Sequence, residues 1–214
     1  MQQPGKPVLH PRLDDHGKPV LILKPSCPSD LAAWSDLNAT ACVVPDGAMP
    51  DEVNGIPVAR WLDAPTTETG WEALASQHQI EEPDFVVPHG YKPAAGAVIR
   101  EADGRVWLVA PSNAYGGYQA TFPKGTLEGK SAQATALVET FEETGLCIRL
   151  ITHLVDVKRS QSYTRYFSAE RVDGDPADMG WESQAVMLVP LHELHVWLTS
   201  THDAPIHSRL KSAA

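Results

Sequence analysis

Residues 131–144 constrain the fold more than any other segment, because they combine helix-capping signals with a helical pattern of apolar residues. Ser131 is suited to cap the start of a helix, and Gly145 can take the left-handed conformation after its end. Apolar side chains recur at spacings of three and four residues, at Ala134, Leu137, Val138 and Phe141. The segment therefore predicts a helix with one face buried in a core.

Another face of the same helix carries Glu139, Glu142 and Glu143, at positions i, i+3 and i+4. These like charges repel one another, and two of them crowd the helix C-terminus, where the helix dipole disfavours anions. Carboxylates gathered in this way suit Mg²⁺ or Mn²⁺, which also bind substrate phosphates. The alternative is an exposed acidic face, which is common for an isolated Glu-x-x-Glu-Glu pattern.

The segments around this helix are predicted to be strands. Residues 95–100 and 105–110 are apolar runs joined by a turn that contains Asp103-Gly104, a combination typical of a β-hairpin. Further strands are predicted at residues 148–157, 163–170 and 184–189, and a short closing helix at residues 191–199. The order of strands, helix, strands, helix predicts a mixed α/β domain.

The first 90 residues are rich in proline and glycine and carry no motif that indicates chemistry. Strands are predicted at residues 19–23, 40–44 and 56–61, and helices at residues 29–37 and 66–78, the first capped by Ser29. Residues 81–92 are predicted to be a linker. We therefore expect a small N-terminal α/β region of unknown role, residues 1–90, followed by a second domain, residues 91–214.

Charge and composition exclude several classes of protein. Lys plus Arg is 17 and Asp plus Glu is 27, which gives a formal net charge of −10 and argues against a DNA-binding protein. The three cysteines show no CxxC spacing, so a disulfide framework is not expected. The N-terminus lacks the apolar run of a signal peptide, and no stretch is long enough for a membrane span. A cytoplasmic protein without a membrane partner is expected.

Residues 122–146 resemble the Nudix box, the signature of the Nudix hydrolase family. Counting back from Gly145, Glu139, Glu142 and Glu143 match the three helix glutamates, and Leu146 matches the final apolar position. Gly125 matches the first glycine of the box if one loop residue is deleted. The resemblance extends over about residues 94–200. It implies a mixed sheet with flanking helices, an α/β/α sandwich, and a hydrolase that cleaves nucleoside diphosphates linked to another group.

The chain departs from the family pattern at three positions. Lys130 stands where the family has a loop glutamate, Val138 where it has an arginine that orients the carboxylates, and Thr140 where it has an apolar residue. Glu128 is a candidate replacement for the loop acid. The departures leave open reduced activity, an altered metal requirement, or a nucleotide-binding module that does not cleave.

The resemblance also assigns roles to the acidic residues. Glu139, Glu142 and Glu143 would bind Mg²⁺ or Mn²⁺, and Glu142 and Glu143 would thereby act in catalysis. Pyrophosphate hydrolysis also needs a general base, for which Glu182 is the candidate on position alone. The alternative for Glu182 is a solvated loop acid.

A nucleotide with a polyphosphate bridge, such as diadenosine tetraphosphate, is the expected substrate. The Phe-Pro-Lys-Gly entry to the box resembles the dinucleoside polyphosphate and diphosphoinositol polyphosphate branches, and Tyr163 stands where the former carry a tyrosine. Five residues are candidates for binding it: Lys124, Lys158, Arg159, Tyr163 and Arg165. ADP-ribose remains an alternative substrate. The alternation of Tyr163 and Arg165 could also be one face of a strand, and a homodimer contact is one role left open for residues 1–90.

Overall fold

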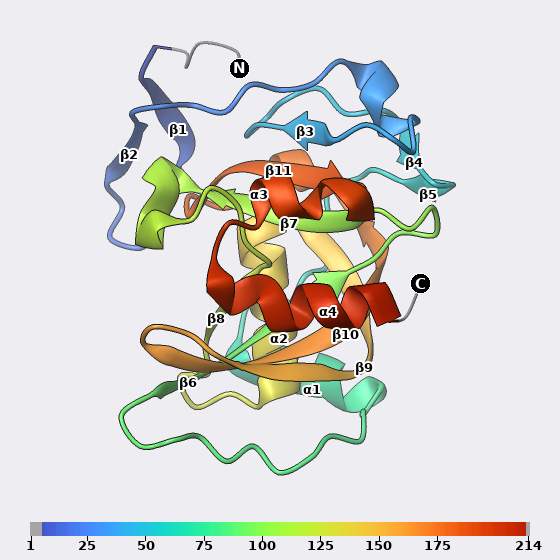
Figure 1. Ribbon diagram of the computed structural model, residues 1–214. Helices are drawn as coiled ribbons and strands as arrows, with labels where there is room; N and C mark the ends of the chain where they lie inside the picture. The colour runs from blue at the N-terminus through green and yellow to red at the C-terminus, as the bar shows by residue number, and fades with distance from the viewer. Residues whose placement is uncertain (1–5, 213–214) are drawn as a thin grey trace.

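The computed structural model describes residues 6–212, which form two main β-sheets with helices on either side and two separate two-stranded sheets, β1-β2 and β4-β5 (Figure 1). The strands are β1 (Val8–Leu13), β2 (Pro19–Ile22), β3 (Ala41–Val43), β4 (Glu52–Val53), β5 (Ile56–Pro57), β6 (Lys92–Ile99), β7 (Val106–Pro111), β8 (Lys124–Thr126), β9 (Leu146–Lys158), β10 (Ser162–Gly174) and β11 (Ser183–Val189). The α-helices are α1 (Glu68–Gln77), α2 (Ala132–Thr144), α3 (Leu194–Trp197) and α4 (Ala204–Ser212). Short 3₁₀ turns include η1 (Leu31–Trp34), η2 (Ser112–Gly117), η3 (Pro176–Asp178), η4 (Leu191–Glu193) and η5 (Thr201–Asp203).

The two main sheets lie between helical layers. One is four-stranded in the order β8-β6-β10-β9, with β6 parallel to β10, and the other is three-stranded in the order β3-β11-β7. Helix α2 packs in the core on one side, where Leu137 and Val138 meet apolar residues of both sheets. On the other side Leu194 of α3 and Ile206 of α4 pack on a second core cluster. This confirms the predicted α/β/α sandwich.

The predicted hairpin of residues 95–110 forms only at its turn. The amide of Glu101 donates to the carbonyl of Arg105, and Arg100 bridges to Val106. Beyond that point β6 joins the four-stranded sheet and β7 the three-stranded sheet. The Asp-Gly signal therefore predicted the turn correctly, but the two apolar strands continue into different sheets because each is buried against its own neighbours.

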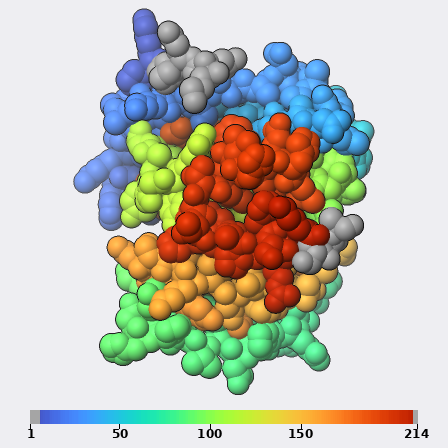
Figure 2. Space-filling view, viewed as in Figure 1, coloured from blue at the N-terminus to red at the C-terminus, as the bar shows by residue number. Residues whose placement is uncertain are grey.

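The N-terminal region packs directly on the rest of the molecule. Strand β3 pairs antiparallel with β11 and so completes the three-stranded sheet. The rings of Trp34 and Trp107 lie 5.8 Å apart, and Trp71 of α1 lies 5.8 Å from Phe141 of α2. Figure 2 shows the blue part of the N-terminal region above the red C-terminal segment, which covers the middle of that face. Whether residues 1–90 are a separate domain stays a prediction.

Several predicted boundaries differ from the structure. The helix expected at residues 29–37 is only the turn η1, capped at Asp30, because Ser29 bonds instead to the backbone of Cys42. The strand expected at residues 56–61 is only two residues long. The closing helix at 191–199 is broken into η4 and α3, and the sequence reasoning missed α4 entirely. Among the described residues, no helix is both long and apolar enough to cross a membrane.

Candidate active site

Helix α2 is fixed at both ends as its sequence predicts. The Ser131 hydroxyl accepts a hydrogen bond from the amide of Ala134 at 3.1 Å, and Gly145 ends the helix with φ of 71°. The carboxylate of Glu72 on α1 accepts from both the amide and the hydroxyl of Ser131. Because α2 is capped and packed along most of its length, the glutamates near its C-terminus project from a rigid support.

The three predicted glutamates differ in exposure. Glu143 is only 7% exposed, and its carboxylate accepts from the amide of Lys124 at 3.2 Å. Glu139 is half-buried against Gly125: a Cβ placed on that glycine would lie 2.0 Å from Oε2 of Glu139. Glu142 is exposed. A side chain at Gly125 would therefore displace the Glu139 carboxylate from its position beside the entry loop.

The three carboxylates have raised pKa values, because each is partly shielded from solvent by protein atoms and lies near other negative charges. Burial raises the pKa of Glu139 to about 8, and the charges of Glu143 and Glu142 add to the rise. Burial raises the pKa of Glu143 to about 7, although the Lys124 ammonium opposes the increase. Burial also raises the pKa of Glu142, with the charge of Glu182 as the next cause. Raised pKa values in one cluster are typical of a functional site.

Glu182, the candidate general base, lies close enough to the helix glutamates for its charge to raise their pKa values, and its role as a base stays a prediction. The loop before it approaches the end of α2 closely, since the amide of Gly180 donates to the carbonyl of Glu142 at 2.7 Å. A Cβ on Gly180 would lie 2.5 Å from that carbonyl oxygen, so only glycine allows the approach. More than a third of Glu182 is exposed, yet the protein atoms around its carboxylate raise its pKa, and the charge of Asp15 adds to this.

The donor set fits a divalent cation in its chemistry. Glu139, Glu142 and Glu143 offer carboxylate oxygens, the ligands that Mg²⁺ and Mn²⁺ prefer, and their mutual repulsion favours a bound cation. Within residues 6–212, no group of three or more His, Cys, Asp or Glu side chains is arranged to hold a metal ion as it stands. A cation would therefore have to draw the carboxylates closer together.

The three departures from the family pattern have different structural consequences. Val138 is buried in the core and offers no group that could orient a carboxylate. Thr140 is also fully buried. The Lys130 ammonium lies close enough to lower the pKa of Glu139 and Glu142, so a positive charge stands where the family has a negative one. Glu128 raises the pKa of Glu142 and Glu182, which places its carboxylate near the cluster, as expected for a replacement acid.

Two of the predicted substrate-binding residues lie at or near the surface and have positive charges. Lys124 is half-buried, and its ammonium lowers the pKa of both Glu143 and Glu182. Its Nζ lies 5.9 Å from the ring centre of Tyr118. Lys158 is exposed and lies over the ring of Tyr91 at 4.6 Å. Of the two, Lys124 is the one that the structure brings to the glutamates.

The other predicted substrate-binding residues have internal contacts. Arg159 is buried and donates to Asp203 and to the hydroxyl of Tyr166, both at 2.9 Å. Arg165 is buried in ion pairs with Asp156 and Glu82. Tyr163 stacks on Phe85 with ring centres 5.6 Å apart. Their roles toward substrate stay predictions, and the contacts of Arg165 indicate a structural role.

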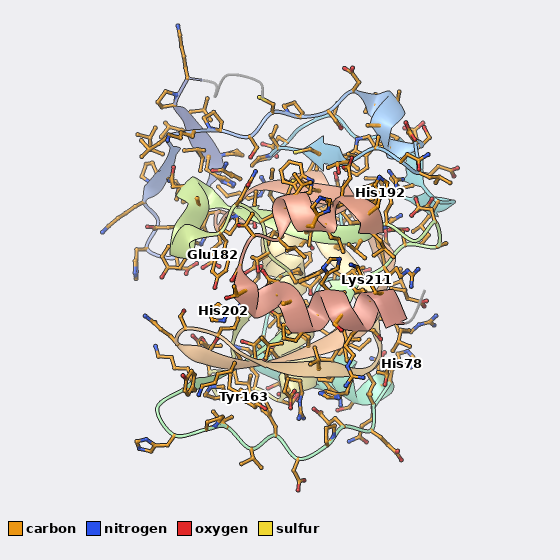
Figure 3. All side chains as sticks on the ribbon, in the orientation of Figure 1. His78, Tyr163, Glu182, His192, His202 and Lys211 are labelled. Carbon is orange, nitrogen blue, oxygen red and sulfur yellow. The ribbon has the colours of Figure 1, made fainter. Side chains whose placement is uncertain are left out.

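Sequence reasoning missed Asp15, which lies in the turn between β1 and β2. Its carboxylate accepts from Nε1 of Trp181 at 2.9 Å and raises the pKa of Glu142 and Glu182. The sequence Asp14-Asp15-His16-Gly17 indicates a turn, but no local signal shows that this turn reaches the acidic cluster. Figure 3 labels Glu182 beside the N-terminal half of the molecule.

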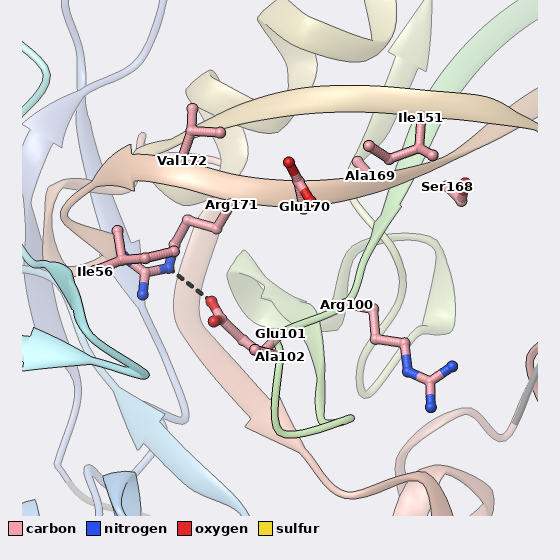
Figure 4. Close-up of a pocket in the computed structure, with 10 residues that line it drawn as sticks. All are labelled: Ile56, Arg100, Glu101, Ala102, Ile151, Ser168, Ala169, Glu170, Arg171 and Val172. Atoms are coloured by element: carbon pink, nitrogen blue, oxygen red, sulfur yellow. Dashed lines mark hydrogen bonds and ion pairs between the residues drawn. The ribbon is translucent and has the colours of Figure 1, made fainter.

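Two surface hollows lie away from these glutamates. One, of about 630 Å³, is lined by β10 and by the turn between β6 and β7, where Arg171 pairs with Glu101 (Figure 4). The second, of about 190 Å³, lies between α1 and β9. None of the four glutamates of the cluster, Glu139, Glu142, Glu143 and Glu182, lines either hollow.

Comparison with known proteins gives one family. The model of the NUDIX domain matches residues 90–210. No match was found among curated proteins. A NUDIX hydrolase from Nitrosomonas europaea is 19% identical with a TM-score of 0.49, over 58% of this chain and 73% of that chain. An Ap4A hydrolase from C. elegans is 21% identical with a TM-score of 0.47, over 57% and 94%. A MutT protein from Methanosarcina mazei Go1 is 17% identical with a TM-score of 0.45, over 57% and 91%.

Proposed function

The chain belongs to the Nudix family, and we propose that it hydrolyses a nucleotide with a polyphosphate bridge, using a divalent cation held by Glu139, Glu142 and Glu143. As a Nudix-type hydrolase, it acts on phosphoanhydride bonds. One observation supports the site: four glutamates from α2 and the loop before β11 influence one another's ionisation. Buried like charges of this kind are costly unless a ligand of opposite charge joins them.

The side chains have distinct roles in this proposal. When bound, Mg²⁺ or Mn²⁺ neutralises phosphate oxygens and lowers the pKa of water. Glu182 takes a proton from the attacking water as its oxygen bonds to phosphorus, while the bond from that phosphorus to the bridging oxygen breaks. The leaving phosphate departs as an anion, and the ammonium of Lys124 offsets its charge. Lys124 is well placed for this because it already acts on Glu143 and Glu182.

The substrate class rests on charge and on aromatic surface. Lys124 and Lys130 supply positive charge beside the cluster, which suits a chain of phosphates, and the exposed Lys158 adds a positive charge over the ring of Tyr91. The stacked pair of Phe85 and Tyr163 offers an aromatic surface on β10 for a base. A dinucleoside polyphosphate such as diadenosine tetraphosphate combines both features, and ADP-ribose and diphosphoinositol polyphosphates are the competing substrates.

The test compares these three substrates with Mg²⁺ or Mn²⁺ present, or with the metal removed by chelation. We expect diadenosine tetraphosphate to be cleaved fastest and only with metal. Glu142→Gln and Glu143→Gln should each lower kcat by about 100-fold or more, because each removes a charged ligand. Glu68→Gln, which neutralises an exposed glutamate on α1, is the matched control and should retain wild-type kcat.

Two outcomes would contradict the proposal. If all three substrates survive at high enzyme concentration while calorimetry shows nucleotide binding, the chain is a binding module without catalysis, in keeping with Lys130 and Val138. If ADP-ribose or a diphosphoinositol polyphosphate is cleaved faster, the hydrolase stands and the substrate class is wrong.

A further inference from the structure

The hairpin of β1 and β2 contacts the loop that carries Glu182 through three side chains. Nε2 of His10 lies 3.1 Å from the carbonyl oxygen of Ser183, and Arg12 forms an ion pair with Asp178. Nε1 of Trp181 donates to Asp15 at 2.9 Å. Two of these contacts fall on the residues immediately before and after Glu182, so the hairpin holds the loop on both sides of the proposed base.

The contact of His10 with the carbonyl of Ser183 is a buried hydrogen bond. His10 is buried, and its Nδ1 lies 3.0 Å from the amide nitrogen and 3.3 Å from the carbonyl oxygen of Arg12. Because the carbonyl of Ser183 can only accept, Nε2 donates to it in the tautomer that has the proton on Nε2. Burial lowers the pKa of His10, which favours this neutral form. The contact between β1 and the start of β11 is therefore a directed hydrogen bond.

The hairpin is itself held against the molecule near its other strand. The side-chain amide of Asn113 in η2 donates to the carbonyl of Leu21 at 2.8 Å and accepts from the amide of Leu23 at 2.7 Å. Figure 1 shows β2 beside η2, on the same side as the start of β11. Because both strands are tied down, the turn between them is positioned to hold Asp15 against Trp181.

The backbone of the Glu182 loop already has support from the opposite side. The amide of Ser112 donates to the carbonyl of Glu182, and its hydroxyl donates to the carbonyl of Trp181, both at 2.7 Å. These bonds fix the backbone and do not involve the indole of Trp181. The bond to Asp15 fixes the indole, which is the bulkiest neighbour of the Glu182 side chain along the chain.

We propose that the N-terminal hairpin completes the active site, with Asp15 as a positioning residue that holds Trp181 and thereby sets the direction of the Glu182 carboxylate. The inference rests on the proposed function for the role of Glu182. It gives residues 6–24, outside the matched family region, a part in the reaction. The hydrogen bond between Trp181 and Asp15 is exposed and contributes little to the free energy of unfolding, so its role is to orient the Trp181 ring.

The activity test uses Asp15→Ala, Trp181→Phe and the double variant. Asp15→Ala removes the acceptor of the hydrogen bond and keeps the rest of the hairpin. Trp181→Phe removes the donor and keeps an aromatic ring at position 181. We expect kcat to fall about tenfold in each, with KM for diadenosine tetraphosphate unchanged, because orientation of the base affects the transition state. The double variant should be no slower than either single variant, since both break the same bond. His16→Ala, in the same turn, is the control and should behave as wild type.

Asp15→Asn separates positioning from charge. Its amide oxygen can still accept from Trp181, but the negative charge beside Glu182 is gone. We expect this variant to recover at least half of the wild-type kcat. If Asp15→Asn is as slow as Asp15→Ala, the carboxylate acts through its charge and the positioning role is wrong. Wild-type kcat in Asp15→Ala would overturn the proposal outright.

Hydrogen–deuterium exchange provides a readout that does not depend on activity. In Asp15→Ala, residues 179–184 should exchange several-fold faster than in the wild type, because the loop has lost one of its supports. The control His16→Ala should leave this exchange unchanged. If exchange quickens but the wild-type protein cleaves no substrate, the hairpin still positions the loop and only the proposed function fails. Unchanged exchange in Asp15→Ala would contradict the inference even in an active enzyme.

Discussion

Buried charges occur in two contrasting settings in this molecule. Four arginines are 3% exposed or less, and each has an acidic partner: Arg105 with Asp103, Arg159 with Asp203, Arg165 with Asp156 and Arg171 with Glu101. Several also donate to backbone carbonyls, as Arg105 does to Ala33, Trp34 and Asp36. Each of these charges has an ion-pair partner within the chain, as expected for groups that stabilise a fold, although Nη2 of Arg159 and Oδ2 of Asp203 are buried without a hydrogen-bond partner among the described residues.

The acidic cluster is the opposite case. Glu139 and Glu143 are removed from solvent to different degrees, and their nearest charges include further carboxylates. Lys124 and Lys130 offset part of this charge, but the pKa of Glu139 is still raised to about 8 and that of Glu143 to about 7. A fold that pairs its buried arginines so consistently leaves these carboxylates short of positive charge. The difference indicates that the missing charge comes from outside the chain.

The largest expected effect comes from breaking one of the paired sites. Arg171 donates to Glu101 at 2.7 Å and to the carbonyl of Val53, and so joins β10 to the two-stranded sheet of β4 and β5. Arg171→Met should lower the free energy of unfolding by about 3 kcal/mol, because Glu101 is left buried without its cation. Urea denaturation measures the change.

The control for this prediction replaces both partners. Glu101 also accepts from Trp107 and Asn54, so a neutral amide at this position keeps some hydrogen bonds. Arg171→Met combined with Glu101→Gln should therefore recover part of the loss. A loss below about 1 kcal/mol in the single variant would show that the pair is no more important than a surface salt bridge.

The sequence predicted the acidic helix well because its signals are local. The cap at Ser131, the glycine at 145 and the apolar stripe all lie within one segment, and the structure confirms both helix ends. Ala134, Leu137 and Val138 are buried as predicted, whereas Phe141 is only half-buried against the core, and burial extends beyond the predicted face. Glu182 is a candidate base on position alone, and the sequence does not predict how near it lies to the helix glutamates, which depends on the close approach of Gly180 to α2. No local pattern reports such an approach between distant segments.

The paired arginines show where sequence reasoning was limited. Arg165 was considered for phosphate binding because an arginine on a strand is chemically suited to it, but its partners Glu82 and Asp156 come from the linker and from β9. The separation of β6 and β7 into two sheets has the same origin. In each case the outcome is set by contacts between remote segments, which propensity and spacing do not encode.

A smaller effect should follow from changing the charge beside the cluster. Lys130 lowers the pKa of Glu139 and Glu142, so it supplies part of the positive charge that the site lacks. Lys130→Glu removes this charge and adds a carboxylate, which should tighten Mg²⁺ or Mn²⁺ binding about tenfold, or about 1.4 kcal/mol. Calorimetric titration of the metal measures the change, and Lys130→Gln should give an intermediate value.

The control is Lys211→Glu, which makes the same change of charge on α4 and should leave metal affinity as in the wild type (Figure 3). Equal affinity in Lys130→Glu and the wild type would mean that the ammonium does not compete with the metal. The shortage of positive charge around the buried glutamates would then have no effect on metal affinity.

The smallest expected effect concerns the pH dependence of a paired site. Burial alone would raise the pKa of Asp156, but hydrogen bonds from Arg165 and His153 outweigh it and hold the pKa below the usual value of 3.8. Because the folded pKa is depressed, the pair contributes stability above about pH 4 and loses it as pH falls through the folded pKa. In the wild type, the free energy of unfolding should fall as pH drops below about 4, because Asp156 takes up a proton and its pairing weakens. Asp156→Asn has no such proton to take up, so its free energy of unfolding should fall by about 1 kcal/mol less. The free energy of unfolding, measured between pH 2 and 5, would show the same pH dependence in the wild type and in Asp156→Asn if Arg165 did not stabilise the ionised carboxylate.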